Sequence, residues 1–272
     1  MAVRTSEKNL KNDKILGRES RNKVPFSVVE AYKSLRIHLV SLLDKSNSKV
    51  VVISSANASE GKSTTAINLA VTLSQLNKSV VLIDADSRRA TVHQKSKVEN
   101  GKGCLDVING DVPLKEAVVQ YNQYMDIITA GSVFNNPTEL FCSNAFERMV
   151  TELRNMYDYV VIDTPPINLV SDALVIAQKA DGMVMVVRSG VTTYETFKNA
   201  LMSVNRLGIN VLGSVLNGVG ADTGKYLKYG LYGSYKKYYR YGRYGYGYGY
   251  RTSYRSNRTK KGTDSKDSKA KK

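Results

Sequence analysis

Residues 56–63, A-N-A-S-E-G-K-S, have the residue types and spacing of a phosphate-binding loop. Such a loop needs a small residue, four free positions and then Gly-Lys-Ser, so that backbone N–H groups can approach phosphates closely. Lys62 would neutralise the β- and γ-phosphates of ATP, and Ser63 would offer its hydroxyl to Mg²⁺. A flanking Val/Ile run and an apolar helix favour this interpretation over an ordinary strand–helix turn. The nucleotide-lining positions of this phosphate loop are Ala56, Asn57, Ala58, Ser59, Glu60, Gly61, Lys62, Ser63 and Thr64.

Three carboxylates follow two other apolar runs. Residues 83–89 read I-D-A-D-S-R-R, and residues 160–166 read V-V-I-D-T-P-P. Asp84 and Asp86 are two residues apart and therefore on one side of an extended chain. Ser63, Asp84 and Asp163 would hold Mg²⁺, and Asp84 or Asp86 would accept the proton of an incoming hydroxyl. Singly, each carboxylate is more typical of a helix cap or a surface charge. Jointly with Lys62 they predict a catalytic site.

A cluster of phenol hydroxyls lies near the C-terminus. Twelve tyrosines, separated mainly by Gly, Lys and Arg, occupy positions Tyr226, Tyr229, Tyr232, Tyr235, Tyr238, Tyr239, Tyr241, Tyr244, Tyr246, Tyr248, Tyr250 and Tyr254. We expect residues 222–272 to be a disordered tail, because this composition offers no core. A flexible segment of about 30 residues spans roughly 30 Å, so its hydroxyls can visit a nearby ATP site. A nucleic-acid-binding tail or a solvated appendage without an acceptor role are the alternatives.

The charge of the chain is concentrated in the same segment. The net charge is +16, and residues 223–272 hold 15 basic and 2 acidic residues, which leaves the remainder at +3. The N-terminal residues 1–25 are polar and basic, and we expect a flexible arm without a signal peptide. No apolar stretch is long enough for a transmembrane helix. Cys104 and Cys142 have no metal-ligand spacing, and we expect both to be reduced and partly buried. These features predict a cytoplasmic protein.

Apolar runs alternate with helical patterns between residues 26 and 221, the predicted domain. An amphipathic helix is expected over residues 27–43, from the spacing of Val28, Val29, Tyr32, Leu35, Leu39 and Leu42, and a second helix over residues 62–75. Strands are expected at residues 49–54, 79–84, 125–129, 157–163, 182–188 and 210–216. Their nearly continuous Val/Ile/Leu content predicts an α/β fold of the P-loop NTPase type, a parallel sheet with helices on both faces. Ligands of such sheets bind at the carboxyl ends of the strands.

The three motifs together resemble the bacterial tyrosine kinases of capsule and exopolysaccharide operons. Residues 53–70 resemble that family's Walker A motif, residues 80–89 its Walker A′ and residues 157–166 its Walker B. Residues 30–36, 135–141 and 186–192 agree as well, and the similarity spans roughly residues 26–254, including the tyrosine cluster. Ala58 and Ala90 stand where family members commonly have proline, but neither change removes a phosphate or metal ligand.

The resemblance implies a protein-tyrosine kinase that uses MgATP and phosphorylates its tail tyrosines between subunits. It implies a ring-shaped homo-oligomer, an octamer, assembled through a Glu-x-x-Arg-x-x-Arg motif that here reads Glu30, Lys33 and Arg36. By resemblance, Asn217 hydrogen-bonds the adenine. The implied partners are a membrane-embedded polysaccharide co-polymerase that activates the kinase at the inner face of the plasma membrane, and a phosphotyrosine phosphatase. Polysaccharide synthesis and export would be the process served, and no specific nucleic acid is expected.

The closest alternative on this fold is a partitioning or cell-division ATPase with a deviant Walker A motif. Those proteins carry a lysine directly after the first small residue of the loop. This chain has Asn57 at that position. The kinase interpretation is therefore favoured.

Overall fold

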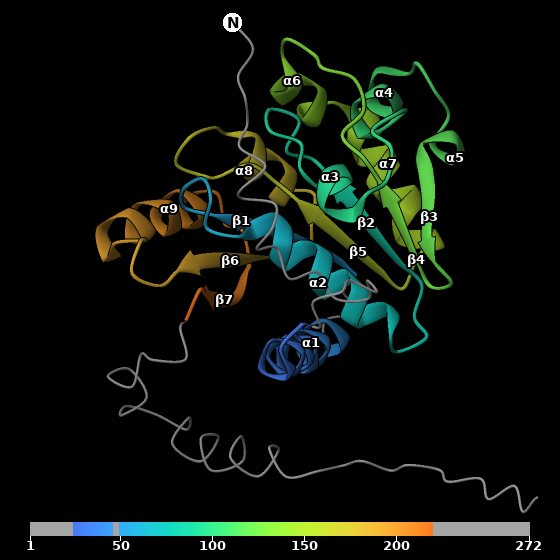
Figure 1. The fold of residues 1–272 in the computed structure, drawn as a ribbon. Coiled ribbons are helices and arrows are strands. Elements are labelled where there is room, and N and C mark those ends of the chain that lie inside the picture. The colour runs from blue at the N-terminus through green and yellow to red at the C-terminus, as the bar shows by residue number, and fades with distance from the viewer. Residues whose placement is uncertain (1–23, 46–48, 220–272) are drawn as a thin grey trace, which may run out of the picture. The chain divides into compact units, whose positions relative to one another are not determined.

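The computed structural model describes residues 24–45 and 49–219 of the chain (Figure 1). The predicted N-terminal arm, apart from its last two residues, and the tyrosine cluster lie outside the described residues. The predicted boundaries of the domain and the tail therefore stay predictions.

One seven-stranded sheet forms the centre of the described part. Its order is β3 (Val118–Asn122), β4 (Met125–Ile128), β2 (Val80–Asp84), β5 (Tyr159–Asp163), β1 (Val50–Ser55), β6 (Gly182–Arg188) and β7 (Val211–Asn217). All neighbouring strands are parallel except β3, which is antiparallel to β4. The α/β fold predicted from the apolar runs is confirmed, and each of the six expected strands is present.

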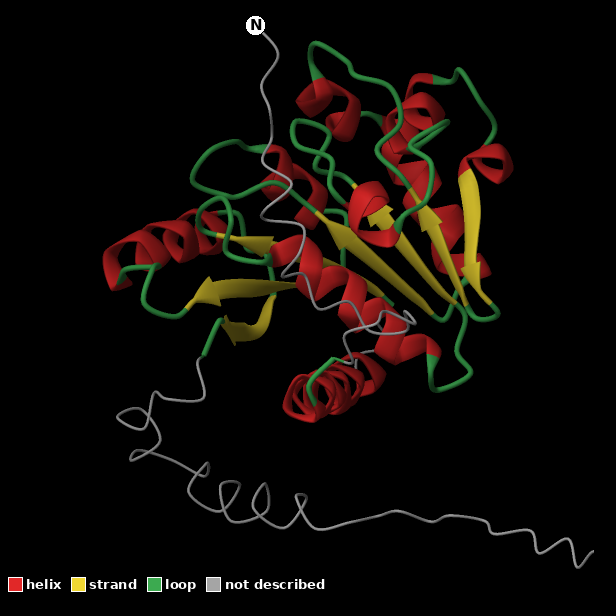
Figure 2. Cartoon of the chain, in the orientation of Figure 1, coloured by secondary structure: helices red, strands yellow, loops and turns green. Residues whose placement is uncertain are grey.

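Helices cover both faces of this sheet, as Figure 2 shows. One layer holds α1 (Phe26–Lys45), α2 (Lys62–Ser74) and α3 (Val92–Ser96). The other holds α4 (Cys104–Asn109), α5 (Leu114–Ala117), α6 (Pro137–Cys142), α7 (Asn144–Met156), α8 (Asp172–Ala177) and α9 (Tyr194–Arg206). Successive residues of β1 alternate between the two cores: Val51 and Ile53 pack with α1 and α2, whereas Val50 and Val52 pack with the other layer. This period of two explains why the strand is apolar throughout.

The edge strand β3 is the element that the sequence analysis did not predict. Its five residues are half-buried or exposed, so they lack the continuous apolar pattern of the central strands. A tight turn at residues 123–124 connects it to β4, and so short a connection allows only antiparallel pairing. The short helices α3 to α6, of four to six residues, are likewise too brief to show a helical period.

Two side chains lie differently from their expected positions. On α1, Leu43 is buried at 1% exposure and Leu42 is exposed at 42%, because the residues that face α2 drift around the helix. Cys104 is buried as expected, but Cys142 is exposed at the end of α6, so the prediction of partial burial is wrong for it.

Membrane-spanning helices were also sought in the described ranges. None of the helices there is long and apolar enough to cross a bilayer.

The start of β1 is fixed by one carboxylate. Asp181 Oδ2 accepts hydrogen bonds from the backbone N–H groups of Lys49 at 2.6 Å and Val50 at 2.8 Å, and from Arg154 Nη1 at 2.7 Å. Burial favours the neutral acid, but these donors outweigh it and hold the pKa of Asp181 below its ordinary value. Asp181 therefore stabilises the fold when it is ionised.

We expect Asp181→Asn to lower the free energy of unfolding by about 1–3 kcal/mol at pH 7, because an amide satisfies these donors less well. Since the folded-state pKa is depressed, the contribution of Asp181 is present at neutral pH and disappears as the pH falls below about 4. The difference between variant and wild type should shrink over that range in urea unfolding. The control is Glu147→Gln, which breaks the exposed Glu147–Lys179 pair and should change stability by less than about 1 kcal/mol. An equal loss in both variants at every pH would contradict this role.

Candidate active site

Three adjacent strands bring the predicted site together. In the order β2, β5, β1, the middle strand ends at Asp163, and Asp84 on β2 is its register partner. On the other side, Ile53 of β1 pairs with Asp163, and β1 leads directly into the phosphate loop. Asp163 therefore lies between Asp84 and the phosphate loop at the carboxyl edge of the sheet.

The phosphate loop has the backbone conformation that phosphate binding requires. Ser59 and Gly61 have φ values of 65° and 100°, in the left-handed region. Gly61 directly precedes α2, and as a glycine it has no side chain to occupy the first N–H groups of that helix. Those groups have no intrahelical acceptors, and the helix dipole favours an anion beside them.

Lys62 forms a buried ion pair with Asp86. Lys62 Nζ lies 2.5 Å from Asp86 Oδ2, and the two side chains are 10% and 4% exposed. Burial lowers the pKa of Lys62, but Asp163, Asp86 and Asp84 together outweigh it and hold this pKa above its ordinary value. The Lys62 ammonium is therefore charged, and its nearest partner is the carboxylate of Asp86 in the Walker A′ segment.

Asp163 is fully buried, and neither of its carboxylate oxygens accepts a hydrogen bond of good geometry, although the Ser63 hydroxyl lies close enough to favour its charged form. Burial raises the pKa of Asp163 to about 6, with Lys62 and the Ser63 hydroxyl opposing the shift. Asp84 is also buried, but it accepts hydrogen bonds from the N–H groups of Asp86 at 3.2 Å and Val92 at 3.0 Å. Burial and the nearby Asp163 raise the pKa of Asp84 well above its ordinary range. Asp84 and Asp163 are thus two buried acids side by side, and only Asp84 accepts hydrogen bonds from backbone N–H groups.

These residues fit Mg²⁺. The three carboxylates and one ammonium leave an excess of two negative charges when all are ionised. No group of three or more His, Cys, Asp or Glu side chains in the described part of the chain is arranged to hold a metal by itself. Mg²⁺ usually binds through one or two carboxylates, with phosphate oxygens and water completing its shell. The bare oxygens of Asp163 and the neighbouring Ser63 hydroxyl meet that need.

One segment, residues 188–192 at the end of β6 and before α9, braces the phosphate loop. Buried Glu60 accepts hydrogen bonds from Asn57 N at 3.1 Å and from Thr192 Oγ1 at 2.6 Å. Arg188 Nη1 donates to the Ser59 carbonyl at 2.7 Å. The side chain of Glu60, which we predicted to line the nucleotide, thus holds the loop itself. Sequence reasoning gave Arg188 and Thr192 no role, although both lie in a stretch that matches the family.

Asn217, at the end of β7, also contacts the phosphate loop. Its Nδ2 donates to the Glu60 carbonyl at 3.0 Å, and its Oδ1 accepts from Gly218 N at 2.8 Å. A Cβ placed on Gly61 would lie 2.0 Å from Asn217 Nδ2, so a larger residue would displace this amide and would also be strained at the φ of 100°. The predicted contact of Asn217 with adenine stays a prediction, but Asn217 does lie at the site.

Arg88 connects the Walker A′ segment to two other segments. Its Nε donates to Asp172 Oδ2 at 2.8 Å and its Nη2 to Asp172 Oδ1 at 3.3 Å, while Nη2 also contacts Thr138 Oγ1 at 3.2 Å. Asp172 is fully buried at the start of α8, and it accepts the Thr138 hydroxyl as well. The planar guanidinium thus holds the segment of Asp86 against α6 and α8.

The predicted oligomer motif lies on α1. Glu30 Oε1 and Lys33 Nζ form an ion pair at 2.9 Å, both partly exposed. Arg36 Nη1 instead donates to the Thr72 carbonyl of α2 at 2.8 Å. Arg36 is therefore engaged within its own chain, and the interface role of the three residues stays a prediction.

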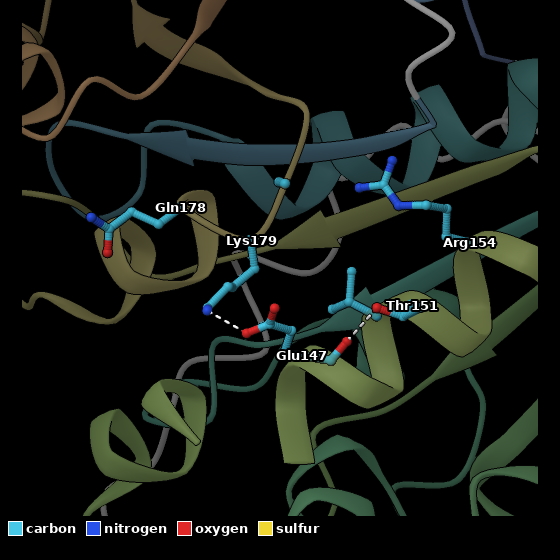
Figure 3. Close-up of a pocket in the computed structure, with 7 residues that line it drawn as sticks. Glu147, Thr151, Arg154, Gln178 and Lys179 are labelled. Atoms are coloured by element: carbon cyan, nitrogen blue, oxygen red, sulfur yellow. Dashed lines mark hydrogen bonds and ion pairs between the residues drawn. The ribbon is translucent and has the colours of Figure 1, made fainter. Parts of the chain in front are cut away.

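A surface hollow of about 380 Å³ lies elsewhere, between α7 and the residues that follow α8 (Figure 3). Figure 3 shows the Glu147–Lys179 ion pair and the Thr151 hydroxyl bond that line it. None of the predicted site residues contributes to it. We therefore assign the candidate site to the phosphate loop and its carboxylates.

Comparison with known proteins identifies close relatives. A family model described as an AAA domain matches residues 48–209, more than half of the chain. The tyrosine-protein kinase YwqD of Bacillus subtilis (strain 168) is 37% identical over 202 residues, which cover 74% of this chain and 84% of YwqD. The tyrosine-protein kinase CpsD of Streptococcus agalactiae is 34% identical over 184 residues, 67% of this chain and 80% of CpsD. The solved kinase domain of Escherichia coli tyrosine kinase ETK superposes with a TM-score of 0.71 at 28% identity, covering 82% of this chain and 91% of that domain.

We expect Asp163→Asn to raise the free energy of unfolding at pH 7 by about 1–3 kcal/mol, because it removes a buried charge whose burial Lys62 and Ser63 do not fully offset. The raised folded-state pKa means that wild type itself gains this stability as the pH falls from 7 toward 4, so the advantage of the variant should fade there. Urea unfolding at both pH values measures the difference.

The matched control is Asp86→Asn, which leaves the buried Lys62 ammonium without its closest partner. This change should destabilise the fold by about 1–3 kcal/mol, the opposite sign from Asp163→Asn. If both substitutions destabilise the fold equally, the assignment of Asp163 as a destabilising buried charge is wrong.

Proposed function

The chain belongs to the bacterial tyrosine-protein kinases, and on that premise we propose that it transfers the γ-phosphoryl group of ATP to tyrosines of its own C-terminal segment. The observation that carries the proposal is the buried Lys62–Asp86 pair beside the bare carboxylate of Asp163, at the N-terminus of α2. Such a site supplies positive charge for phosphates, oxygen ligands for Mg²⁺ and a base for a hydroxyl. Twelve phenols follow it in the same chain.

The residues of the site divide this work between them. The backbone of residues 57–64 and the start of α2 would hold the β- and γ-phosphates. Lys62 would turn from Asp86 to the phosphates, and this movement frees the Asp86 carboxylate to accept the phenolic proton. Ser63, Asp84 and Asp163 would hold Mg²⁺, which neutralises charge that builds up on the transferring group. Asn217 would contact the adenine beside the loop.

Transfer between subunits of a ring is supported by the outer surface of α1. Glu30 and Lys33 are partly exposed there, and Phe26 and Ile37 are 66% and 63% exposed. Positions 26, 30, 33 and 37 lie on one side of a helix, so charged and apolar groups share a surface. We propose this surface, with Glu30 and Lys33 exchanging partners and Arg36 bracing α1 on α2, as the contact in an octameric ring.

The cellular setting is part of the same proposal. The kinase would act at the inner face of the plasma membrane, where a membrane-embedded polysaccharide co-polymerase would activate it. A phosphotyrosine phosphatase would remove the phosphates that it adds. Its process would be the synthesis and export of a capsular polysaccharide or exopolysaccharide.

Arg88 positions Asp86 for this reaction without touching the nucleotide. We expect Arg88→Ala to lower kcat by about 10- to 100-fold, because a small displacement of a reacting group is costly. The KM for ATP should change little, since the contacts of the phosphate loop are intact. Arg88→Lys should restore only part of kcat because it lacks the bidentate fork, and Arg148→Ala on α7 is the control. Equal loss in kcat and in ATP affinity would point to a general structural defect instead.

The function itself is tested by incubating the full chain with ATP and Mg²⁺ and mapping phosphotyrosine by mass spectrometry. Wild type should acquire phosphotyrosine within residues 226–254. The Lys62→Met variant should acquire none, because the β- and γ-phosphates of ATP would lack the lysine cation. A full-length chain with all twelve of these tyrosines changed to Phe should retain ATP binding and lose most of the label. ATP turnover with unmodified tyrosines in wild type would refute the proposal.

A further inference from the structure

Tyr194 is the one exposed tyrosine among residues 24–45 and 49–219. It is the first residue of α9 and is 81% exposed. The other tyrosines in these ranges are buried or half-buried: Tyr32, Tyr121, Tyr124, Tyr157 and Tyr159. A tyrosine side chain must be exposed on its own molecule before it can enter the active site of another. Tyr194 alone on the described body meets that condition.

Tyr194 lies at the same edge of the sheet as the candidate active site. The loop between β6 and α9, residues 189–193, ends one residue before it. Within that segment Thr192 donates to Glu60 of the phosphate loop at 2.6 Å, and Arg188, directly before it, donates to the Ser59 carbonyl at 2.7 Å. Tyr194 is therefore two residues from a direct contact with the phosphate loop.

Two exposed apolar side chains lie on the segments next to this position. Leu169, in the loop after β5, and Val191 are each 62% exposed. Asn168 Nδ2 donates to the Thr196 carbonyl at 3.1 Å, which fixes the loop after β5 against the first turn of α9. Apolar surface next to an exposed phenol gives a second molecule something to contact while the hydroxyl stays in water.

The folded chain can also accommodate a phosphate on Tyr194. A phosphotyrosine carries about −1.5 to −2 charges. At the first residue of the 13-residue helix α9, this charge is favoured by the helix dipole. Lys198 follows one turn later, at a spacing that allows an ion pair with the modified side chain. A phosphate on Tyr194 would therefore be compatible with the start of α9.

We propose that Tyr194 is a further phosphoacceptor, modified by a second copy of this chain; the proposal rests on the kinase function above. Thr193 Oγ1 caps α9 by accepting Thr196 N at 3.2 Å, so Tyr194 is fixed as the first residue of a helix and not carried on a free loop. In the second copy's site, the Tyr194 Oη–phosphorus bond forms as the bond from the γ-phosphorus to the bridging oxygen breaks. That oxygen leaves with ADP, and the phenolic proton passes to Asp86 of the second copy.

The experiment uses the full chain with the twelve C-terminal tyrosines changed to Phe. After incubation with ATP and Mg²⁺, trypsin releases residues 189–198, S-G-V-T-T-Y-E-T-F-K, in which Tyr194 is the one tyrosine. We expect phosphotyrosine in this peptide. Adding Tyr194→Phe should abolish the remaining phosphotyrosine, whereas Tyr124→Phe, at the opposite edge of the sheet, should leave it unchanged. In a mixture with wild type, an isotope-labelled Lys62→Met chain should be modified at Tyr194.

Each result separates this inference from the function on which it rests. If wild type modifies residues 226–254 but the peptide stays unmodified in every chain, the inference is overturned and the kinase function stands. If wild type forms no phosphotyrosine anywhere, both fail. If active chains carry the modification but Lys62→Met chains in the mixture do not, transfer from a second copy is refuted.

Discussion

The structure of the candidate site depends on holding three carboxylates close together in a buried place. Asp84, Asp86 and Asp163 lie at the ends of the neighbouring strands β2 and β5, where they are buried from solvent, and Lys62 lies among them. Removing such charges from water is costly unless they are paired. The fold bears this cost because a phosphoryl-transfer site needs bare carboxylate oxygens and a cation that can turn toward a phosphate. This burial raises the pKa values of Asp84 and Asp163.

The loops at the carboxyl edge keep this charged cluster in order. On one side, Arg88 joins the Walker A′ segment to the fully buried Asp172 of α8. On the other, Glu60 and Thr192 join the phosphate loop to the segment that leads into α9. These side-chain contacts are strong because donors or acceptors are ionised and partly shielded from water. The precise arrangement of the acids therefore depends on residues far from them in the sequence.

The sequence predicted the fold, and the placement of Lys62 beside the three carboxylates, because each signal was local. Continuous Val/Ile runs predicted buried parallel strands, and the Gly-Lys-Ser turn predicted where α2 begins. The braces were missed since their partners are far apart: Arg88 and Asp172 are separated by 84 residues, and Glu60 and Thr192 by 132. Edge strand β3 was missed because half-exposed strands lack a continuous apolar pattern. Exposure, as at Tyr194, is a property of the folded surface that no local pattern reports.

Asn217 is the last residue of the edge strand β7, and its amide is also part of the wall of the phosphate loop. One short side chain thus belongs to the outermost parallel strand and to the cradle for the nucleotide. The position of β7 at the rim of the sheet therefore sets how much room the backbone has at Gly61.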